Sequence, residues 1–232
     1  MKAIILAAGK GTRFLPITNK MPKCLIEINN KPILEYILEQ LPDEIDEIIL
    51  VTAHLEDKIK EYFGNSFKNT KIIYKSMSDE TKYGTAIAVF TIKDIIKNDE
   101  KFLVLNSDDL VLKSDLENII NIKNNFVFAI HKDIPKNTKF LDIKTENDRI
   151  IGFEKIEELK PINIATGVYK LDSNIFNYEP YLLKNGEYSL PHTILNLSKN
   201  YFINSYEMKN WLPINDLNEL DIANKKIINF FN

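Results

Sequence analysis

The sequence is poor in several residue types that mark particular protein classes. Its 232 residues include one cysteine, seven glycines and only two arginines, and no apolar run approaches the length of a membrane span. The single cysteine, Cys24, forms no disulfide within the chain, which excludes a disulfide-stapled scaffold and indicates a reducing compartment. The N-terminal apolar run is too short for a signal peptide. We therefore expect a cytoplasmic protein.

Strong net charge is also missing. Thirty basic and 33 acidic residues give a formal net charge of −3, so no general attraction to nucleic acid or to an anionic membrane is expected. Any basic group that binds an anion must be placed locally. With 44% hydrophobic residues, the composition is that of a globular protein. The length favours a single domain over 1–232, and a homo-oligomer is left open.

The first half of the chain alternates short apolar runs with amphipathic segments, which predicts βαβ units and a parallel sheet. The predicted strands are 2–7, 47–52, 71–75 and 101–106. The predicted helices are 33–41, 55–63 and 85–97, and Ser114 with Glu117 resembles a capping box that opens a fourth.

The second half, from about residue 126, changes to a β-rich pattern. The predicted strands are 126–131, 139–144, 149–155 and 163–171. We expect them to be antiparallel and to extend the same sheet. The C-terminal quarter returns to helix, with Asp216 and Glu219 as a capping box. The predicted fold is α/β: a Rossmann-like, doubly wound, mainly parallel mixed sheet with an antiparallel extension.

Two of the seven glycines and one of the two arginines lie together in LAAGKGTR, residues 6–13. This turn leaves the carboxyl end of a predicted parallel strand, where open α/β sheets bind ligands, and its N–H groups could cradle phosphate. A dinucleotide fingerprint would need a glycine at Phe14, and the P-loop pattern is absent. A tight turn that needs a positive φ is the purely structural alternative.

The longer stretch LAAGKGTRFLPITNKMPKCLIEINNKPILEYI resembles the N-terminal pattern of the sugar-phosphate nucleotidyltransferases. The resemblance implies that 1–125 is a nucleotide-binding half and 126–232 an acceptor-binding half with the C-terminal helix. It further implies that Arg13 and Lys23 are the catalytic cations. The loop residues implied to contact the nucleotide are Leu6, Ala7, Ala8, Gly9, Gly11 and Thr12.

Two further segments resemble elements of the same family. Gly84 and Thr85, in YGTAIA, match its GTAxA element, which implies contact with the nucleotide base. The family's base-reading Gln is replaced here by Asp79. In VLNSDDL, two carboxylates follow an apolar strand, and the resemblance implies that Asp108 binds Mg²⁺. Asp109 either assists indirectly or is simply solvated.

The β-rich half holds the implied sugar-phosphate contacts. Glu154 and Lys155 resemble the family's Glu-Lys pair, and Thr166 and Gly167 lie in NIATGVY, which resembles the stretch beneath the sugar. As an isolated feature, such a Glu-Lys pair is most often a surface pair. Phe140-Leu141 replace the usual Tyr-Gly, and because leucine cannot copy the close backbone approach of a glycine, the sugar position stays open.

The second metal ligand is placed in INDL, near the C-terminus. Other branches of the family use an Asn or Asp at this spacing, and we favour Asn215 over Asp216, whose alternative role is to cap the final helix. The histidines His54, His131 and His192 have no paired spacing, so neither a zinc site nor a catalytic triad is supported.

By resemblance, the expected activity is Mg²⁺-dependent conversion of an NTP and a sugar 1-phosphate to an NDP-sugar and pyrophosphate. No general base is needed, because the phosphate nucleophile is already anionic at neutral pH. One alternative is a cytidylyltransferase that acts on phosphocholine or another non-sugar phosphate. The other is a catalytically silent protein that binds nucleotide sugars. Base, sugar, pathway and oligomeric state stay open.

Overall fold

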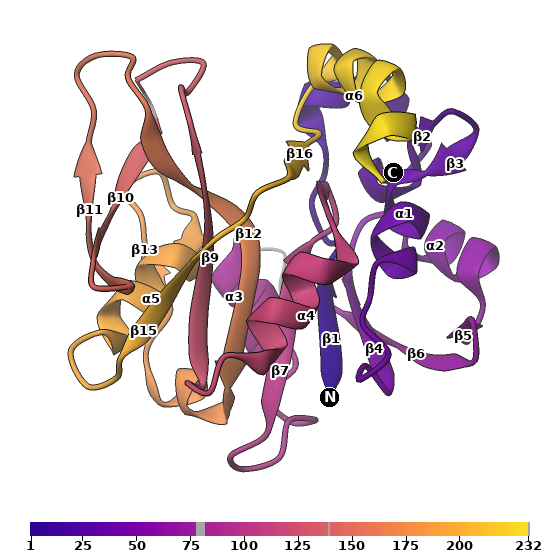
Figure 1. Ribbon diagram of the computed structural model, residues 1–232. Helices are drawn as coiled ribbons and strands as arrows, with labels where there is room; N and C mark the ends of the chain where they lie inside the picture. Colours follow the sequence, from indigo (N-terminus) through magenta and orange to yellow (C-terminus); the bar gives the residue numbers. More distant parts are fainter. Residues whose placement is uncertain (78–81, 139, 232) are drawn as a thin grey trace.

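The computed structural model describes residues 1–77, 82–138 and 140–231. Its centre is a ten-stranded mixed sheet in the order β10-β11-β15-β9-β12-β7-β1-β4-β6-β5 (Figure 1). The strands are β1 (Lys2–Leu6), β4 (Glu47–Thr52), β5 (Ser66–Phe67), β6 (Thr70–Ser76), β7 (Lys101–Asn106), β9 (Phe126–Asp133), β10 (Leu141–Glu146), β11 (Arg149–Lys155), β12 (Ile162–Asp172) and β15 (Ile203–Glu207). The α/β fold class predicted from the sequence is confirmed.

The first half of the chain forms the parallel part of the sheet. Strand β1 pairs in parallel with β4 and β7, and β4 pairs in parallel with β6. These strands are continuous apolar runs because helices cover both faces of the sheet. The register places Leu6 beside Val51 and Asn106, so the carboxyl ends of β1, β4 and β7 lie at one edge.

The second half extends the sheet mainly by antiparallel pairing, as expected. Strand β12 pairs antiparallel with β7 and β9, and β10 pairs antiparallel with β11. The prediction of a purely helical C-terminal quarter is wrong, because β15 inserts between β9 and β11 and runs parallel to β9. β15 is a short strand near the outer end of the sheet, and most of its residues are only partly buried, which gives a weak sequence signal.

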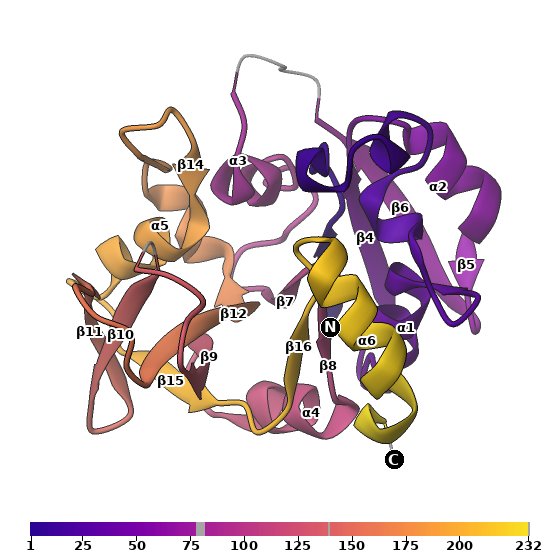
Figure 2. The same cartoon turned by 90° about the horizontal axis from the view of Figure 1, so that it is seen from above.

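The helices cover both faces of the sheet (Figure 2). They are α1 (Ile33–Glu39), α2 (Glu56–Phe63), α3 (Thr85–Phe90), α4 (Lys113–Asn121), α5 (Leu190–Leu197) and α6 (Leu217–Phe230). One core layer packs α1, α2, α4 and α6 against one face, and the other packs α3 and α5 against the opposite face. No helix in the described part of the chain is both long and apolar enough to cross a bilayer.

Two predicted helix boundaries are wrong, for local reasons. Helix α4 begins at Lys113, with Leu112 rather than Ser114 as its N-cap and no side-chain cap. The Asp115 carboxylate in its first turn is buried and accepts a hydrogen bond from the Tyr206 hydroxyl at 2.8 Å. Helix α3 ends at Phe90, where the Thr91 hydroxyl donates to the Ile87 carbonyl and the next bonds tighten to i→i−3. Asp216 is the N-cap of α6 and accepts from the Glu219 N–H, so the predicted cap is present, whereas the Glu219 carboxylate bonds the Asn215 N–H instead of the Asp216 N–H of a capping box.

Candidate active site

The site lies where the loops after β1 and β7 meet. Lys23, in the loop that follows β1, forms an ion pair with Asp108, which follows β7. The Lys23 side chain is 12% exposed and that of Asp108 22%. Because β1 and β7 are parallel neighbours, both loops leave the same edge of the sheet. The structure therefore joins one predicted catalytic cation directly to the predicted metal ligand.

The glycine loop folds back on itself through Gly11. This residue has a φ of 62°, and a Cβ there would lie 2.8 Å from the Thr18 Cγ2 and 3.0 Å from the Lys23 Cβ. The Thr18 hydroxyl donates to the Gly11 carbonyl at 2.9 Å, which closes the loop. Only glycine fits this combination of φ and contact. The turn requires Gly11 for structural reasons, and the contact of this glycine with a nucleotide stays a prediction.

The same loop presents unpaired donors. The backbone N–H groups of residues 8–13 make no hydrogen bond to any residue that the structure describes. Gly9, Thr12 and Arg13 are exposed, whereas Leu6 and Ala7 are buried at the end of β1 and Ala8 is half-buried. The Arg13 guanidinium also has no ion-pair or hydrogen-bond partner within the described ranges. Such free N–H groups and a free cation suit an anionic ligand.

Asn215 comes one residue after the backbone contact between Ile214 and Asp108. Strand β8 (Asp109–Val111) pairs antiparallel with β16 (Trp211–Pro213), and the Ile214 N–H donates to the Asp108 carbonyl at 2.8 Å. Asn215 follows directly. The Asp216 carboxylate instead accepts from the Glu219 N–H at 2.9 Å, which is its capping role.

These two residues offer one carboxylate and one amide oxygen, which are hard ligands. No group of three or more His, Cys, Asp or Glu side chains suited to a metal occurs in the described part of the chain. Mg²⁺ characteristically takes one or two protein oxygens and completes its shell with water and substrate phosphates. The residues at Asp108 and Asn215 therefore fit Mg²⁺ bound together with a nucleotide.

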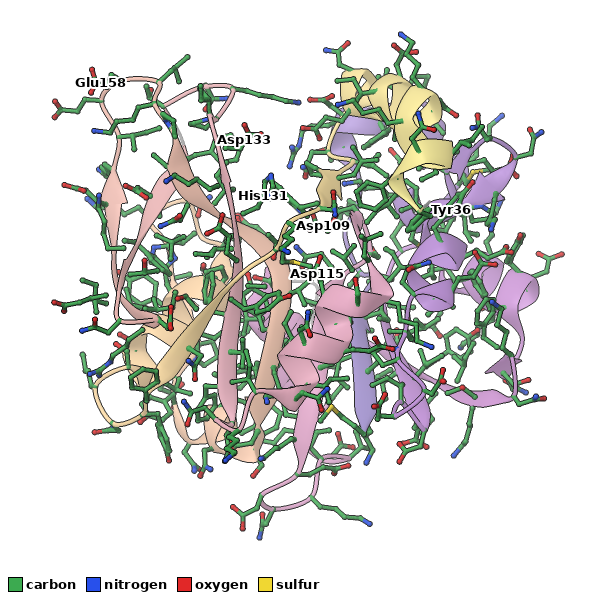
Figure 3. All side chains as sticks on the ribbon, viewed as in Figure 1. Tyr36, Asp109, Asp115, His131, Asp133 and Glu158 are labelled. Atoms are coloured by element: carbon green, nitrogen blue, oxygen red, sulfur yellow. The ribbon has the colours of Figure 1, made fainter. Side chains whose placement is uncertain are left out.

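Asp109 is buried rather than solvated, which corrects the solvated alternative. Its carboxylate accepts from the Trp211 indole N–H at 2.8 Å and from the Asn106 amide at 3.0 Å. Burial, followed by the charge of Asp108, raises the pKa of Asp109 to about 8. Figure 3 shows Asp109 at the centre of the molecule, between the two halves of the sheet.

Gly167 allows this arrangement. It has a φ of 75°, and a Cβ there would lie 2.1 Å from the Asn106 amide nitrogen and 2.5 Å from the Asp109 carboxylate. The neighbouring Thr166 is fully buried, and its hydroxyl donates to the Ala129 carbonyl at 3.0 Å. Gly167 thus lies at the site, whereas the Thr166 hydroxyl is committed to the sheet.

A cavity of about 280 Å³ lies beside Asp109. Asn106 and Asn215 contribute polar groups to it, and the apolar wall includes Leu141 and Phe153. Leu141, which departs from the family pattern, therefore lies in the site. Its side chain occupies space that a glycine would leave open.

Sequence reasoning missed His192, which lines this cavity together with Ser189. The imidazole lies 2.9 Å from the Ser189 hydroxyl, stacks on Tyr181 and meets the Phe153 ring edge-on. Burial lowers its pKa, so it is neutral at physiological pH. Only the three-dimensional packing of α5 against β11 links this residue to the site.

Glu154 does not line the cavity, whereas Lys155 lies opposite the cavity-lining Leu141 and so on the same face of the hairpin as Phe153. Ile143 and Phe153 are directly opposed in the β10–β11 hairpin and both line the cavity. Side chains alternate between the faces of a strand, so Glu154, one residue on, lies on the other face. Its carboxylate pairs with Lys144 at 2.5 Å. The predicted sugar contact of Glu154 would require this ion pair to rearrange.

Gly84 approaches the protein's own backbone. With a φ of 119°, it would place a Cβ 2.3 Å from the Tyr188 carbonyl oxygen. The Thr85 hydroxyl accepts a hydrogen bond from the Leu190 N–H at 3.0 Å, which ties the start of α3 to α5. Both residues thus have a structural role here, and their base contact stays a prediction. Asp79 lies outside the described residues.

A family model described as Nucleotidyl transferase matches residues 2–212. The chain belongs to this family. It is 35% identical over 234 residues to the "Bifunctional protein GlmU" of Methanococcus maripaludis, covering 99% of this chain and 55% of the relative. It is 34% identical to a "Bifunctional sugar-1-phosphate nucleotidylyltransferase/acetyltransferase" of Sulfurisphaera tokodaii, covering 92% and 52%. The chain thus spans about half the length of the curated relatives that it matches.

The solved structures agree with the observed fold. A Bacillus anthracis structure, described as a candidate glucose-1-phosphate thymidylyltransferase in complex with sucrose, superposes with a TM-score of 0.81. The match covers 97% of this chain and 94% of that one, at 26% identity. The overall fold of this chain is therefore shared with that structure over nearly the full length of both chains.

Proposed function

We propose that this protein transfers a nucleotidyl group from an NTP to a sugar 1-phosphate, giving an NDP-sugar and pyrophosphate, with Mg²⁺ as cofactor. The single observation that carries the proposal is the Lys23–Asp108 ion pair beside the free Arg13 and the free N–H groups of residues 8–13. This cluster combines what nucleotidyl transfer requires, namely charge neutralisation and positioning of phosphates.

In the proposed reaction, an oxygen of the sugar phosphate attacks the α-phosphorus in line. The new P–O bond forms as the bond from the α-phosphorus to the bridging oxygen breaks, and pyrophosphate leaves with that electron pair. The loop N–H groups would bind the triphosphate, Arg13 would stabilise charge on the departing pyrophosphate, and Lys23 would neutralise the α-phosphate. Bound Mg²⁺, held by Asp108 and Asn215, would supply further neutralisation of phosphate charge.

We infer that the chain functions as one domain whose 1–125 half binds nucleotide and whose 126–232 half binds the acceptor. The cavity beside Asp109 is the proposed acceptor site. Asn215 lines it, most of its other lining residues come from β10, β11, β12 and α5, and Asn106 and Asp109 come from the first half.

A second candidate is a cytidylyltransferase that acts on phosphocholine or a related amine. Phe140, Phe153 and Trp211 line the cavity together with Asp109, and aromatic rings with a carboxylate suit a cationic group. The raised pKa of Asp109 favours its neutral form and so disfavours this candidate.

The test is pyrophosphate release with Mg²⁺, over a grid of NTPs against five sugar 1-phosphates (glucose, mannose, galactose, glucosamine and N-acetylglucosamine) and phosphocholine. Activity with a sugar phosphate supports the main proposal, and activity with phosphocholine alone supports the second. No activity in any combination, with nucleotide-sugar binding seen by thermal shift, would favour the alternative of a catalytically silent protein that binds nucleotide sugars. An Arg13→Ala variant supplies the background.

A further inference from the structure

Lys136 connects the segment after β9 to the start of helix α6. It lies in the segment 134–138, directly after β9, and its ammonium group pairs with the Glu219 carboxylate and lies 3.6 Å from that of Asp216. Both acidic residues belong to the start of α6, which packs on the first half of the chain. In Figure 3, the labelled Asp133 lies at the upper left, at the end of β9, and α6 is the yellow helix at the upper right.

Glu219 links this ion pair to Asn215. Its side chain is 10% exposed, one carboxylate oxygen pairs with Lys136, and the other accepts the Asn215 N–H at 2.6 Å. An ordinary capping box would direct such a glutamate to the N–H of the N-cap residue, here Asp216. In this protein it reaches one residue further back. The carboxylate thus fixes the backbone of Asn215.

Both ends of this link lead into the same cavity. Phe140 lies four residues after Lys136, and Asn215 lies four residues before Glu219; both Phe140 and Asn215 line the cavity. These two parts of the cavity wall come from segments that are distant in sequence. The Lys136–Glu219 ion pair joins the two segments directly.

The energetics favour a geometric role over a stabilising one. The Lys136 side chain is 53% exposed, and ion pairs with so much solvent access contribute little to the free energy of unfolding. Its loss should therefore leave the fold intact. Its loss should instead let Phe140 and Asn215 move apart more easily, so that the cavity opens more often.

We propose that Lys136 and Glu219 are positioning residues. Their ion pair, called the clasp below, holds the two cavity-lining residues Phe140 and Asn215 in one relative position. The part of this proposal that concerns Asn215 as a metal ligand rests on the proposed function. The clasp itself does not, because it predicts how open the cavity is in the absence of any substrate or metal.

The first test uses Trp211, the one tryptophan of the chain, which lines the cavity. Acrylamide quenching of its fluorescence measures access to the cavity without any ligand. We expect Lys136→Ala and Glu219→Gln each to raise the quenching constant about two-fold, since the local closed state loses one ion pair. Lys136→Arg should restore the wild-type value. Equal quenching in all variants would overturn the proposal.

The matched control is Lys225→Ala. Lys225 pairs with Asp221 at 2.5 Å on the same helix, and both side chains are more than 60% exposed. This variant removes an α6 ion pair that is remote from the cavity, so quenching should stay at the wild-type value. A rise equal to that of Lys136→Ala would mean that any weakening of α6 opens the cavity, which contradicts a specific clasp.

The second test separates the clasp from the proposed function. In the pyrophosphate assay, Lys136→Ala should raise the acceptor KM and the Mg²⁺ concentration for half-maximal rate about five-fold, with kcat within about two-fold of wild type. A variant that alters quenching but neither constant would leave the clasp without a role in positioning. Absence of activity in the wild type would instead overturn the proposed function, while the quenching result would still decide whether the clasp exists.

Discussion

The two halves of the sheet hold the candidate site in different ways. In the 1–125 half, residues chosen from short motifs meet directly, as Lys23 and Asp108 do. In the 126–232 half, the motif residue Glu154 lies away from the cavity, which is lined by Leu141, Phe153 and His192. Parallel strands deliver their following loops to one edge, whereas in a hairpin each step of one residue moves a side chain to the other face.

The largest expected effect is in the first half. Arg13→Ala should lower kcat about 1,000-fold, because a cation aimed at transferring phosphoryl groups acts mainly in the transition state. The melting temperature should stay unchanged, since Arg13 is exposed and contacts no partner in the described ranges. Steady-state pyrophosphate release and thermal melting measure the two effects. Lys20→Ala, an exposed lysine of the same loop, is the control, and equal losses in both variants would contradict a specific role.

Asp108→Ala should lower kcat about 100-fold and raise the Mg²⁺ concentration needed for activity, because it removes the carboxylate of the proposed metal site. It also leaves Lys23 without its ion-pair partner. The measurement is a Mg²⁺ titration of the initial rate at saturating nucleotide. Unchanged turnover and unchanged Mg²⁺ dependence would remove Asp108 from the metal site.

The raised pKa of Asp109 predicts that the free energy of unfolding depends on pH. The unfolded carboxyl ionises near its ordinary pKa of 3.8, whereas burial raises the folded pKa to about 8. Between these values the folded protein binds a proton that the unfolded chain has released, so stability is greatest below about pH 4 and falls as the pH rises towards 8. We expect the free energy of unfolding of the wild type, relative to that of Asp109→Asn, to fall by about 3 kcal/mol between about pH 5.5 and 8.

Urea unfolding at several pH values measures this difference. The amide introduced by Asp109→Asn can still accept a hydrogen bond from the Trp211 indole but does not titrate. A difference between the two proteins that is constant with pH would show that Asp109 is ionised in the folded state.

The smallest expected effect is in the second half. Leu141→Ala removes apolar volume from the cavity wall, so kcat/KM for the acceptor should change about five-fold and the order of preference among acceptors should shift. The KM for NTP should stay constant. Competition assays between pairs of acceptors measure the shift. Leu159→Ala, at an exposed position of the same half, is the control. A change in the NTP KM alone would place Leu141 at the nucleotide instead.

Most of the fold could be predicted from the sequence. The pattern of apolar residues located β1, β4, β6, β7 and β12 to within one or two residues, because each strand holds an apolar run or an apolar-polar alternation between polar flanking segments. Strand β15 could not be found, since its residues are mixed and its place is set by pairing with β9 and β11. The end of α3 was also missed, because one hydroxyl of Thr91 changes the hydrogen-bond pattern.

The sequence alone determined which kinds of chemical group are present at the site. The glycine loop, the two cations and the strand-end carboxylate are local patterns whose residue types follow from backbone conformation and charge, as with Gly11 at a positive φ. The tertiary structure decided which groups face each other. It buried Asp109 under Trp211, brought His192 into the cavity, turned Glu154 to the other face and joined Lys136 to Glu219. These relations depend on register and on packing between distant segments, and no local pattern encodes either.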